Sequence, residues 1–521
     1  MQKAGRLKVT PSLVFLLLAI LIGGYIRLAK VLPSPTPIGD GGMFYSMTLD
    51  LINNRFRLPE LISYNQIDMP NTYPPLGIYL AGALSAFFHI NLIDVFRFVP
   101  VFFSILSIPA FYFLAKELIK NETQFIIATL IFSLVPPAFE WLIKGGGITR
   151  SPAFVFSLLA LSFAYRLFTQ EKAINLVLAS VFCALTFLFH PQIALYTMAS
   201  AIVFFFFLQC NPIGLKKGLI TASLTLILVS PWMILMMIKY GFIPFVSAFT
   251  TGDYSGLSAI RIIFGNTLSE IGLTSIGVFT LVGVFWYFRD EGWFIPVWTG
   301  MSLFVDPRST PRNFTVVASI CASYTLVKLF RHFSYGKNEK QSDPSNLCAS
   351  KLAGALLILL FGQWLFSSWF TVDLLAGDYS LKDEDLLAMQ WIKENTPRDS
   401  KFLVLTGLTP FDDSFSEWFP AITNRVSLAT VQGKEWDAQQ DFNRLIDGYE
   451  AAQTCLDKSE RCIANWEKDH GVNSDYIFIR LKDSTEAEGE SYPSALARAF
   501  VESDKYEQVF ENDLVEILRK K

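Results

Sequence analysis

Long apolar segments recur along the first 375 residues, and they constrain the fold of this chain more than any other feature. A bilayer core requires about 20 apolar residues in one helix. Windows of this kind predict a polytopic α-helical membrane protein with about eleven spans. The ninth is the weakest because it is short, and the eleven lie at residues 11–29, 95–115, 123–142, 151–168, 173–190, 192–209, 217–238, 268–288, 293–306, 312–331 and 351–372.

The charges divide the chain into two parts. Only 17% of the residues are charged, against about 25% in soluble domains. Residues 378–521 carry 29 acidic and 17 basic side chains, whereas residues 1–377 carry 17 acidic and 26 basic ones. We therefore expect a membrane domain over 1–375 and a soluble domain over 376–521. The basic membrane part suits anionic lipid or phosphate, and the acidic part argues against nucleic acid.

The Lys and Arg residues near the span ends indicate the orientation. Such residues follow the second, fourth, sixth, eighth and tenth spans, so these ends are expected in the cytoplasm. The N-terminus is then cytoplasmic, and the first loop, 30–94, and the tail are extracytoplasmic. We expect two interfacial helices in that loop, at 44–57 and 74–90, because a crossing at 74–90 would turn the later basic clusters outward.

The acidic tail has the pattern of an α/β domain. An amphipathic helix in LLAMQWIKENTP precedes strand-like KFLVLTG and DYIFIRL, and EQVFEND with LVEILRK resembles a terminal hairpin. No Gly-rich phosphate loop follows a strand, so nucleotide binding is not expected. Cys455 and Cys462 are expected to form a disulfide in an oxidising compartment, and two unrelated thiols are the alternative.

Asp40 is the leading candidate for chemistry on the outer face. It lies in IGDGGMFY, where the glycines allow a close approach of substrate. The alternative is an N-cap for the helix at 44–57. An outward-facing enzyme has no nucleotide-sugar pool, so its energised substrate would reside in the lipid. A polyprenyl-phosphate sugar fits, because its transfer requires a base for the acceptor proton and cations for the departing phosphate.

Cations on the expected outer face are candidates for binding that phosphate. Lys144 and Arg150 lie in KGGGITRSP, and Arg308 and Arg312 lie in DPRSTPRN. Guanidinium groups and helix N-termini suit phosphate oxygens, although snorkelling to lipid headgroups is the alternative for each. Further substrate-binding candidates lie on the same face: Tyr45, Asp68, Tyr73 and His190.

The order of these motifs resembles the GT-C superfamily of polyprenyl-phosphate-dependent glycosyltransferases, especially the protein O-mannosyltransferase and aminoarabinose-transferase branch. IGDGGMFY and NTYPPLGIYL stand where that family has its acidic motif and its later paired-proline string, and RFVPVFFSILSIPAFYFLAKELI resembles the second span. The match is good over residues 10–120. Beyond it, GGGITRSPAF, DPRST, EWFPAITNR and YEQVFEND resemble less-characterised bacterial GT-C-like membrane proteins.

The resemblance implies an outward-facing active site with Asp40 as the catalytic acid or base. Gly41 stands where many relatives carry a second acid, and Tyr73 replaces the usual His or Lys before the prolines. The resemblance therefore allows a divalent metal at the site but does not require one. By analogy the terminal domain helps to recruit the acceptor, a glycan, lipid or protein, with Glu417, Trp418 and Arg425 as its candidate residues.

Two other classes of function remain open at this point. The first is a transporter or flippase for lipid-linked sugars, although the related halves and broken helices common in transporters are not visible in the sequence. The second is a non-catalytic membrane scaffold whose tail binds a partner. The leading hypothesis is a glycosyltransferase in which Asp40 is the general base.

Overall fold

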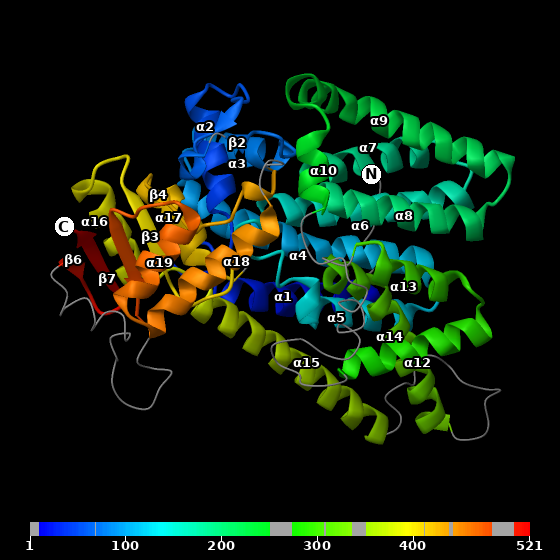
Figure 1. Ribbon diagram of the computed structural model, residues 1–521. Helices are drawn as coiled ribbons and strands as arrows, with labels where there is room; N and C mark the ends of the chain where they lie inside the picture. The colour runs from blue at the N-terminus through cyan, green and yellow to red at the C-terminus, as the bar shows by residue number, and fades with distance from the viewer. Residues whose placement is uncertain are drawn as a thin grey trace, which may run out of the picture.

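The structure is a computed structural model that describes residues 10–67, 69–250, 274–306, 309–335, 351–410, 412–436, 441–481 and 505–521. A helical bundle forms most of it, and a sheet with its own helices lies at one end (Figure 1). Two of the predicted site residues, Asp68 and Arg308, lie outside the described residues.

A helix corresponds to each of the eleven predicted spans. Seven of the described helices are long and apolar enough to cross a membrane. The eleven are α1 (Pro11–Ala29), α4 (Leu92–Leu118), α5 (Glu122–Leu134), α6 (Gly147–Thr169), α7 (Ala173–Phe189), α8 (Pro191–Leu208), α9 (Pro212–Tyr240), α12 (Ser275–Asp290), α13 (Phe294–Phe304), α14 (Thr310–Tyr335) and α15 (Lys351–Asp378).

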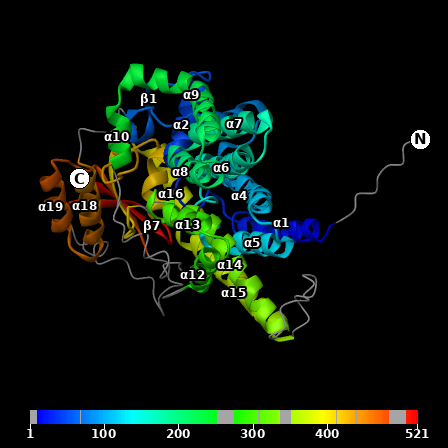
Figure 2. The same cartoon turned by 90° about the vertical axis from the view of Figure 1, so that its right-hand side faces the viewer.

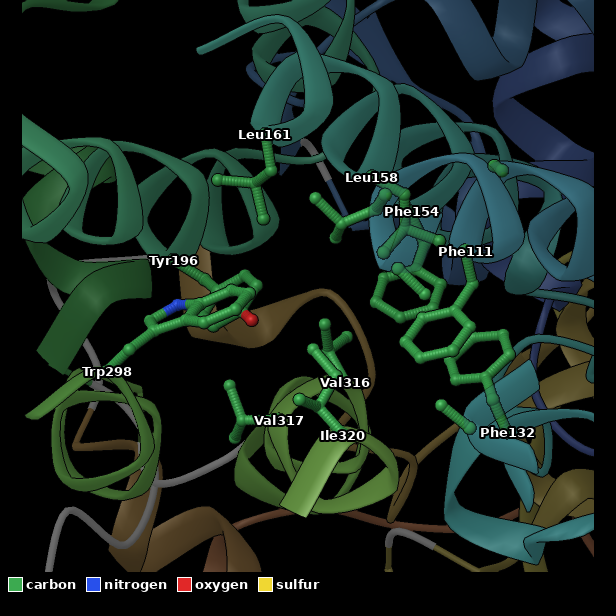
Figure 3. Packing of buried hydrophobic residues seen from close by; sticks show 14 of the residues in the cluster. Phe111, Phe132, Phe154, Leu158, Leu161, Tyr196, Trp298, Val316, Val317 and Ile320 are labelled. Carbon is green, nitrogen blue, oxygen red and sulfur yellow. The ribbon is translucent and has the colours of Figure 1, made fainter. Parts of the chain in front are cut away.

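Helices α6 and α14 lie in the middle of the bundle, and α9 lies on its outside. In the most apolar window, 83% of α14 and 67% of α6 are buried, against 11% of α9. In the core, the rings of Phe111 and Phe132 stack with centroids 4.2 Å apart, and Trp298 lies near Tyr196 (Figure 3). Ile238 of α9 is 78% exposed. An apolar exterior of this kind requires lipid around it.

Helix α5 is shorter than predicted, because the sequence suggested a span over 123–142 and the helix ends at Leu134. Pro136 and Pro137 follow, and a residue before proline is driven out of the helical region. The last carbonyls of the helix then need other donors. Arg27 of α1 donates to the Ser133 carbonyl at 2.7 Å, and Ser368 of α15 donates to that of Leu134.

The first long loop contains both of the short helices that the sequence predicts. They are α2 (Gly42–Asn53) and α3 (Leu76–Phe88). Between them, β1 (Leu61–Ile62) pairs antiparallel with β2 (Met69–Pro70), and the 3₁₀ turn η1 covers Tyr64–Gln66. The loop thus covers one end of the bundle with packed structure.

The C-terminal part is a mixed five-stranded sheet in the order β4-β3-β5-β7-β6. The central strand β5 pairs parallel with β3 and antiparallel with β7. The strands are β3 (Lys401–Leu405), β4 (Val426–Ser427), β5 (Tyr476–Arg480), β6 (Tyr506–Glu511) and β7 (Val515–Lys520). The accompanying helices are α16 (Asp383–Asn395), α17 (Ser414–Thr423), α18 (Phe442–Gln453) and α19 (Glu460–His470). Figure 2 shows α18 and α19 on the far side of the sheet from the bundle.

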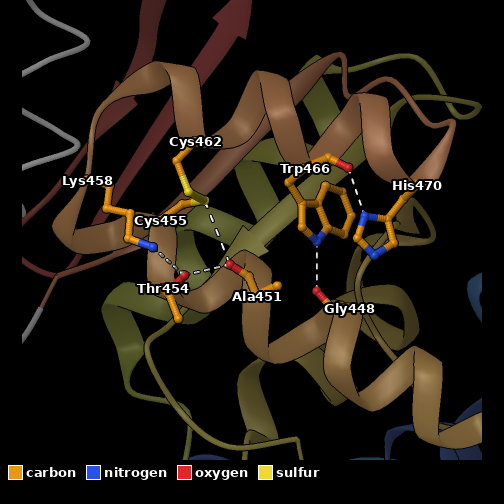
Figure 4. Close-up of a disulfide and its surroundings, with 8 residues drawn as sticks. All are labelled: Gly448, Ala451, Thr454, Cys455, Lys458, Cys462, Trp466 and His470. Carbon is orange, nitrogen blue, oxygen red and sulfur yellow. Dashed lines mark hydrogen bonds between the residues drawn. A yellow bond between two sulfur atoms is a disulfide. The ribbon is translucent and has the colours of Figure 1, made fainter.

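Cys455 and Cys462 form a disulfide in this C-terminal part (Figure 4). It joins the turn after α18 to the first turn of α19. Beside it, the Trp466 ring donates its N–H to the Gly448 carbonyl at 2.7 Å. The covalent link and this hydrogen bond hold α18 and α19 together.

Helix α17 connects the sheet to the first loop. The Tyr64 hydroxyl donates to the Glu417 carbonyl at 2.8 Å. The Asn65 side chain exchanges two hydrogen bonds with the backbone of Ser427. Both contacts come from η1, so the loop between α2 and α3 packs directly against the C-terminal part.

Candidate active site

Two glycine-rich turns lie against each other where α1 leads into α2 and where α5 leads into α6. The N–H of Gly145 donates to the Ile38 carbonyl, and that of Gly146 donates to the Asp40 carbonyl, both at 2.8 Å. A Cβ on Gly145 would meet the Asp40 carbonyl oxygen at 2.3 Å, and one on Gly146 would meet the Asp40 carboxylate at 2.6 Å. Only glycine allows the two backbones to approach so closely.

Asp40 is half-buried on this paired turn, and its carboxylate faces Arg150. The Arg150 guanidinium, in the first turn of α6, donates to both carboxylate oxygens at 2.6 Å. The N–H of Gly146 adds a third contact at 3.3 Å. Helix α2 begins after Gly41 and has no side-chain cap. Asp40 therefore does not serve as the N-cap that its local sequence also suggested.

The surroundings of Asp40 hold it in the charged form. Burial alone would raise the pKa of its carboxyl, but the charges of Arg150 and Lys144 and the hydrogen bonds from Arg150 and Gly146 hold that pKa below its usual value. Burial lowers the pKa of Lys144, and the Asp40 charge opposes this shift. In the structure Asp40 is thus an ion-paired carboxylate.

Three cations converge here from different elements. Lys144 precedes α6, Arg150 opens α6, and Arg312 lies in the first turn of α14. The Lys144 ammonium lies 3.7 Å from the ring centroid of Trp141, and the Arg150 guanidinium lies 5.4 Å from the same centroid. Arg312 lies close enough to Asp306 and to Arg150 to interact with both charges.

Arg312 is the least satisfied of the three cations. It is 4% exposed, and its Nε and Nη2 atoms have no hydrogen-bond partner among the described residues. Buried guanidinium donors normally have acceptors, because leaving them unpaired is costly. An anion with several oxygens would supply the acceptors that Arg312 lacks, and the excess of positive charge beside Asp40 would favour it.

Tyr73 lies beside the cations, and His190 lies beside Tyr73. The Tyr73 hydroxyl is 3.3 Å from that of Thr149, and its ring centroid is 6.4 Å from that of His190. Burial raises the pKa of the Tyr73 hydroxyl to about 12 despite the opposing charge of Arg150. It is therefore a neutral hydrogen-bonding group at this place. The Trp436 ring, 5.9 Å from that of Tyr73, continues the aromatic surface.

The candidates from the C-terminal part are placed differently. The Glu417 carboxyl group accepts the N–H of Gly41 at 2.8 Å, so it lies directly behind the Asp40 turn. Tyr45 lies under the neighbouring Trp418, with ring centroids 5.7 Å apart. Arg425 instead donates to the Thr396 and Lys393 carbonyls at the end of α16. The structure thus brings Glu417 to the site and engages Arg425 elsewhere.

Three aromatic residues of this region were not singled out from the sequence. They are Trp141, beside two of the cations, Tyr379, whose ring lies 5.0 Å from the Lys144 ammonium, and Trp436. The chain has 11 Trp and 18 Tyr, so nothing in the local sequence marks these three rings as site residues. Among the described residues, no group of three or more His, Cys, Asp or Glu side chains could hold a metal ion.

No family model and no curated protein sequence matches the chain. Solved structures do. The arabinofuranosyltransferase AftD from Mycobacteria has a TM-score of 0.58 at 13% identity over 97% of this chain and 40% of that one. ArnT from Cupriavidus metallidurans, bound to undecaprenyl phosphate, has a TM-score of 0.56 at 11% identity over 97% of both chains.

A third similar structure is the archaeal oligosaccharyltransferase AglB from Archaeoglobus fulgidus, in complex with an inhibitory peptide and a dolichol-phosphate. Its TM-score is 0.55 at 13% identity, over 90% of this chain and 69% of that one. All three are GT-C glycosyltransferases. The chain has the GT-C fold. The likeness to ArnT runs from end to end of both proteins, so it includes the C-terminal sheet as well as the bundle.

The GT-C fold confirms the predicted class, a polytopic helical membrane protein with a C-terminal sheet region. Asp40 lies between the end of α1 and the start of α2, where the first loop contacts α6 and α17. The charged groups of the site come from four separate parts of the sequence, and Asp40 is held by a backbone N–H as well as by Arg150.

Proposed function

We propose that the protein is a glycosyltransferase that moves a sugar from a polyprenyl-phosphate donor to an acceptor, with Asp40 as the general base. The observation that carries the proposal is the convergence of one carboxylate with three largely buried cations, Lys144, Arg150 and Arg312. The chemistry requires these two kinds of group side by side. Structures of similar fold have dolichol-phosphate and undecaprenyl phosphate bound.

The ion pair between Asp40 and Arg150 implies that the donor phosphate binds before Asp40 accepts a proton. A carboxylate held by a guanidinium at 2.6 Å is a weak base. A donor phosphate offers Arg150 a competing anion with more acceptor oxygens. When Arg150 turns to the phosphate, the pKa of Asp40 rises toward its ordinary value, and the carboxylate becomes free to accept a proton.

The transfer step then balances within the site. Asp40 takes the acceptor proton as the acceptor atom forms a bond to the anomeric carbon. The bond from that carbon to the phosphate oxygen breaks, and the electron pair leaves with the polyprenyl phosphate. Lys144, Arg150 and Arg312 stabilise the charge on the leaving group. Direct attack of this kind inverts the configuration at the anomeric carbon.

We place this site on the extracytoplasmic side. Basic groups of α6 and α9 lie at the other end of the bundle, where Arg166 pairs with Glu117 of α4 at 2.6 Å and Lys217 donates to the Leu167 carbonyl. Lys and Arg near span ends favour the cytoplasm. The first loop, Asp40 and the C-terminal sheet are then outside, and the acceptor is an extracytoplasmic glycan, lipid or protein.

The test is turnover by the purified protein in lipid nanodiscs. The protein is given polyprenyl-phosphate sugars with cell-envelope acceptors, and released polyprenyl phosphate and glycosylated acceptor are measured by mass spectrometry. We expect equal amounts of both products with at least one donor. Failure with every donor, together with movement of a lipid-linked sugar across vesicle bilayers, would contradict the proposal and favour a transporter.

A further inference from the structure

Two adjacent residues of α17 hold the backbone on both sides of Asp40. The Glu417 carboxyl accepts the N–H of Gly41 at 2.8 Å, and the Trp418 ring N–H donates to the Gly39 carbonyl at the same distance. These are the backbone groups of the residues just before and just after Asp40. Since 376 positions separate Gly41 from Glu417, the C-terminal part completes the turn that carries the proposed base.

The approach of α17 to this turn is as close as the backbone allows. A Cβ on Gly42 would meet the Glu417 carbonyl oxygen at 2.5 Å. Glu417 is 7% exposed, and Trp418 is fully buried. The Trp418 ring lies against those of Tyr45 and Phe96, with centroids 5.7 and 6.4 Å away. Helix α17 is therefore held by packing as well as by its two hydrogen bonds to the turn.

The opposite side of the turn is held by different groups. The Gly146 N–H donates to the Asp40 carbonyl, and the Tyr379 carbonyl accepts the N–H of Gly39 at 2.6 Å. Asp40 is thus held between the turn before α6 and helix α17. If the α17 contacts are lost, the turn keeps its bonds to Gly146 and Tyr379, but its backbone is no longer held on the α17 side.

We propose that Glu417 is a positioning residue for the transfer reaction, which with Trp418 fixes the Asp40 turn so that its carboxylate faces the donor phosphate and the acceptor. The proposal rests on the proposed function. A buried carboxyl acts here through the Gly41 N–H and without touching the substrate. Glutamine has the same acceptor oxygen and shape, so the positioning depends on the acceptor and not on the negative charge.

The test compares Glu417→Ala with Glu417→Gln in the full-length protein. A displacement of about 1 Å at a reacting group can cost about 100-fold in rate. We expect Glu417→Ala to lower kcat by about 10- to 100-fold with little change in the donor KM, and Glu417→Gln to restore most of it. Trp418→Phe, which keeps the ring packing but loses the N–H, should lower kcat in the same way and tests the contact if Glu417→Ala does not fold.

The matched control is Glu467→Ala. Glu467 is also a buried glutamate of the C-terminal part, but it accepts from Ser474 and Lys520. Its loss should lower stability and leave kcat within about threefold of wild type. Similar loss of kcat in Glu467→Ala and Glu417→Ala would show general damage and overturn the proposal. Equal loss in Glu417→Gln and Glu417→Ala would assign a role to the charge and also overturn it.

A second readout does not require activity. Hydrogen exchange followed by mass spectrometry should show faster exchange in the peptide around Gly41 for Glu417→Ala, and unchanged exchange for Glu467→Ala. Faster exchange in a protein that turns over no donor would support the contact and contradict the proposed function. Unchanged exchange with unchanged kcat in Glu417→Ala would overturn the positioning role alone.

Discussion

At the scale of single residues, Glu417 makes the stability of the protein depend on pH. Burial, and next the charge of Asp40, raise its pKa to about 8 from an ordinary value of 4.5, and Arg150 opposes the shift. Between these two values the folded state binds a proton that the unfolded state has released. The free energy of unfolding therefore falls as the pH rises from about 4.5 to about 8.

Glu417→Gln should remove this dependence, because an amide does not titrate. Thermal unfolding in detergent at pH 5 and pH 8.5 measures it, and we expect a smaller fall in Tm between the two values for the variant. The lowered pKa of Asp40 acts in the opposite direction and only in acid, since its contribution is lost as the pH falls through that lowered pKa. Equal falls for wild type and variant would contradict the protonation of Glu417.

Arg312 gives a prediction with opposite effects on binding and stability. Arg312→Met should weaken the binding of undecaprenyl phosphate by about tenfold or more, because a charge-assisted hydrogen bond contributes about 1.5–3 kcal/mol. Its Nε and Nη2 atoms have no partner among the described residues, so the variant should unfold at the same temperature or higher.

Arg425→Met is the matched control for Arg312→Met. It frees the carbonyls of Thr396 and Lys393, so we expect lower stability with unchanged lipid binding. Binding is measured by native mass spectrometry with undecaprenyl phosphate alone. Unchanged lipid binding in Arg312→Met would contradict the assignment of Arg312 to the phosphate site.

The site illustrates which residue contacts a sequence can predict. Asp40 and Lys144 stand beside glycines and Arg150 comes three residues after one, and a charged residue on or next to a glycine-rich turn is a local signal. The contact of Glu417 with Gly41 has no such signal, because it joins positions 376 apart through a backbone N–H. Arg425 has the residue type of a binding group but caps α16, and only the tertiary structure shows which carbonyls it reaches.

At the scale of elements, hydropathy predicted where the membrane helices lie. It did not predict where α5 ends. In lipid each backbone group must be satisfied within its own helix, so long apolar windows correspond to helices. Helix α5 ends early before the paired prolines, and the carbonyls of its last turn find donors on neighbouring helices, Arg27 of α1 and Ser368 of α15. The paired prolines were visible in the sequence, but these donors were not.

Arg27 should therefore stabilise the end of α5. Its guanidinium donates to the carbonyls of Ser133 and Gly23 and to the Ser104 hydroxyl, and it is fully buried. Arg27→Met would leave the Ser133 carbonyl without a donor and should cost about 1–3 kcal/mol of stability. Arg27→Lys keeps one donor and should cost less. Thermal unfolding in detergent measures both, and equal stability of wild type and Arg27→Met would contradict this role.

At the scale of the whole molecule, the orientation can be tested with a native thiol. Cys210 is exposed and lies just after α8, at the end of the bundle that we place in the cytoplasm. In intact cells a membrane-impermeant maleimide should leave Cys210 unmodified, and permeabilised cells should label it. Peptide mass spectrometry identifies the site. Labelling of Cys210 in intact cells would reverse the topology and place Asp40 in the cytoplasm.

The architecture also explains why we assign part of the C-terminal sheet region to the candidate site. The likeness to ArnT covers 97% of both chains. In this protein α17 lies on the first loop and η1 bonds to β4. The charge break near residue 375 predicted a second domain, but its role in holding the Asp40 turn could be recognised only when the two parts were seen together.

The most direct test of the account is the rate of polyprenyl phosphate release by Asp40→Asn. Asp50→Asn is its matched control, since Asp50 lies in α2 of the same loop and accepts from Ser63. Loss of a general base costs about 100- to 10,000-fold. The account predicts a loss of this size in Asp40→Asn, with undecaprenyl phosphate still bound, and a rate near wild type in Asp50→Asn. Release at the wild-type rate by Asp40→Asn would contradict its assignment as the base.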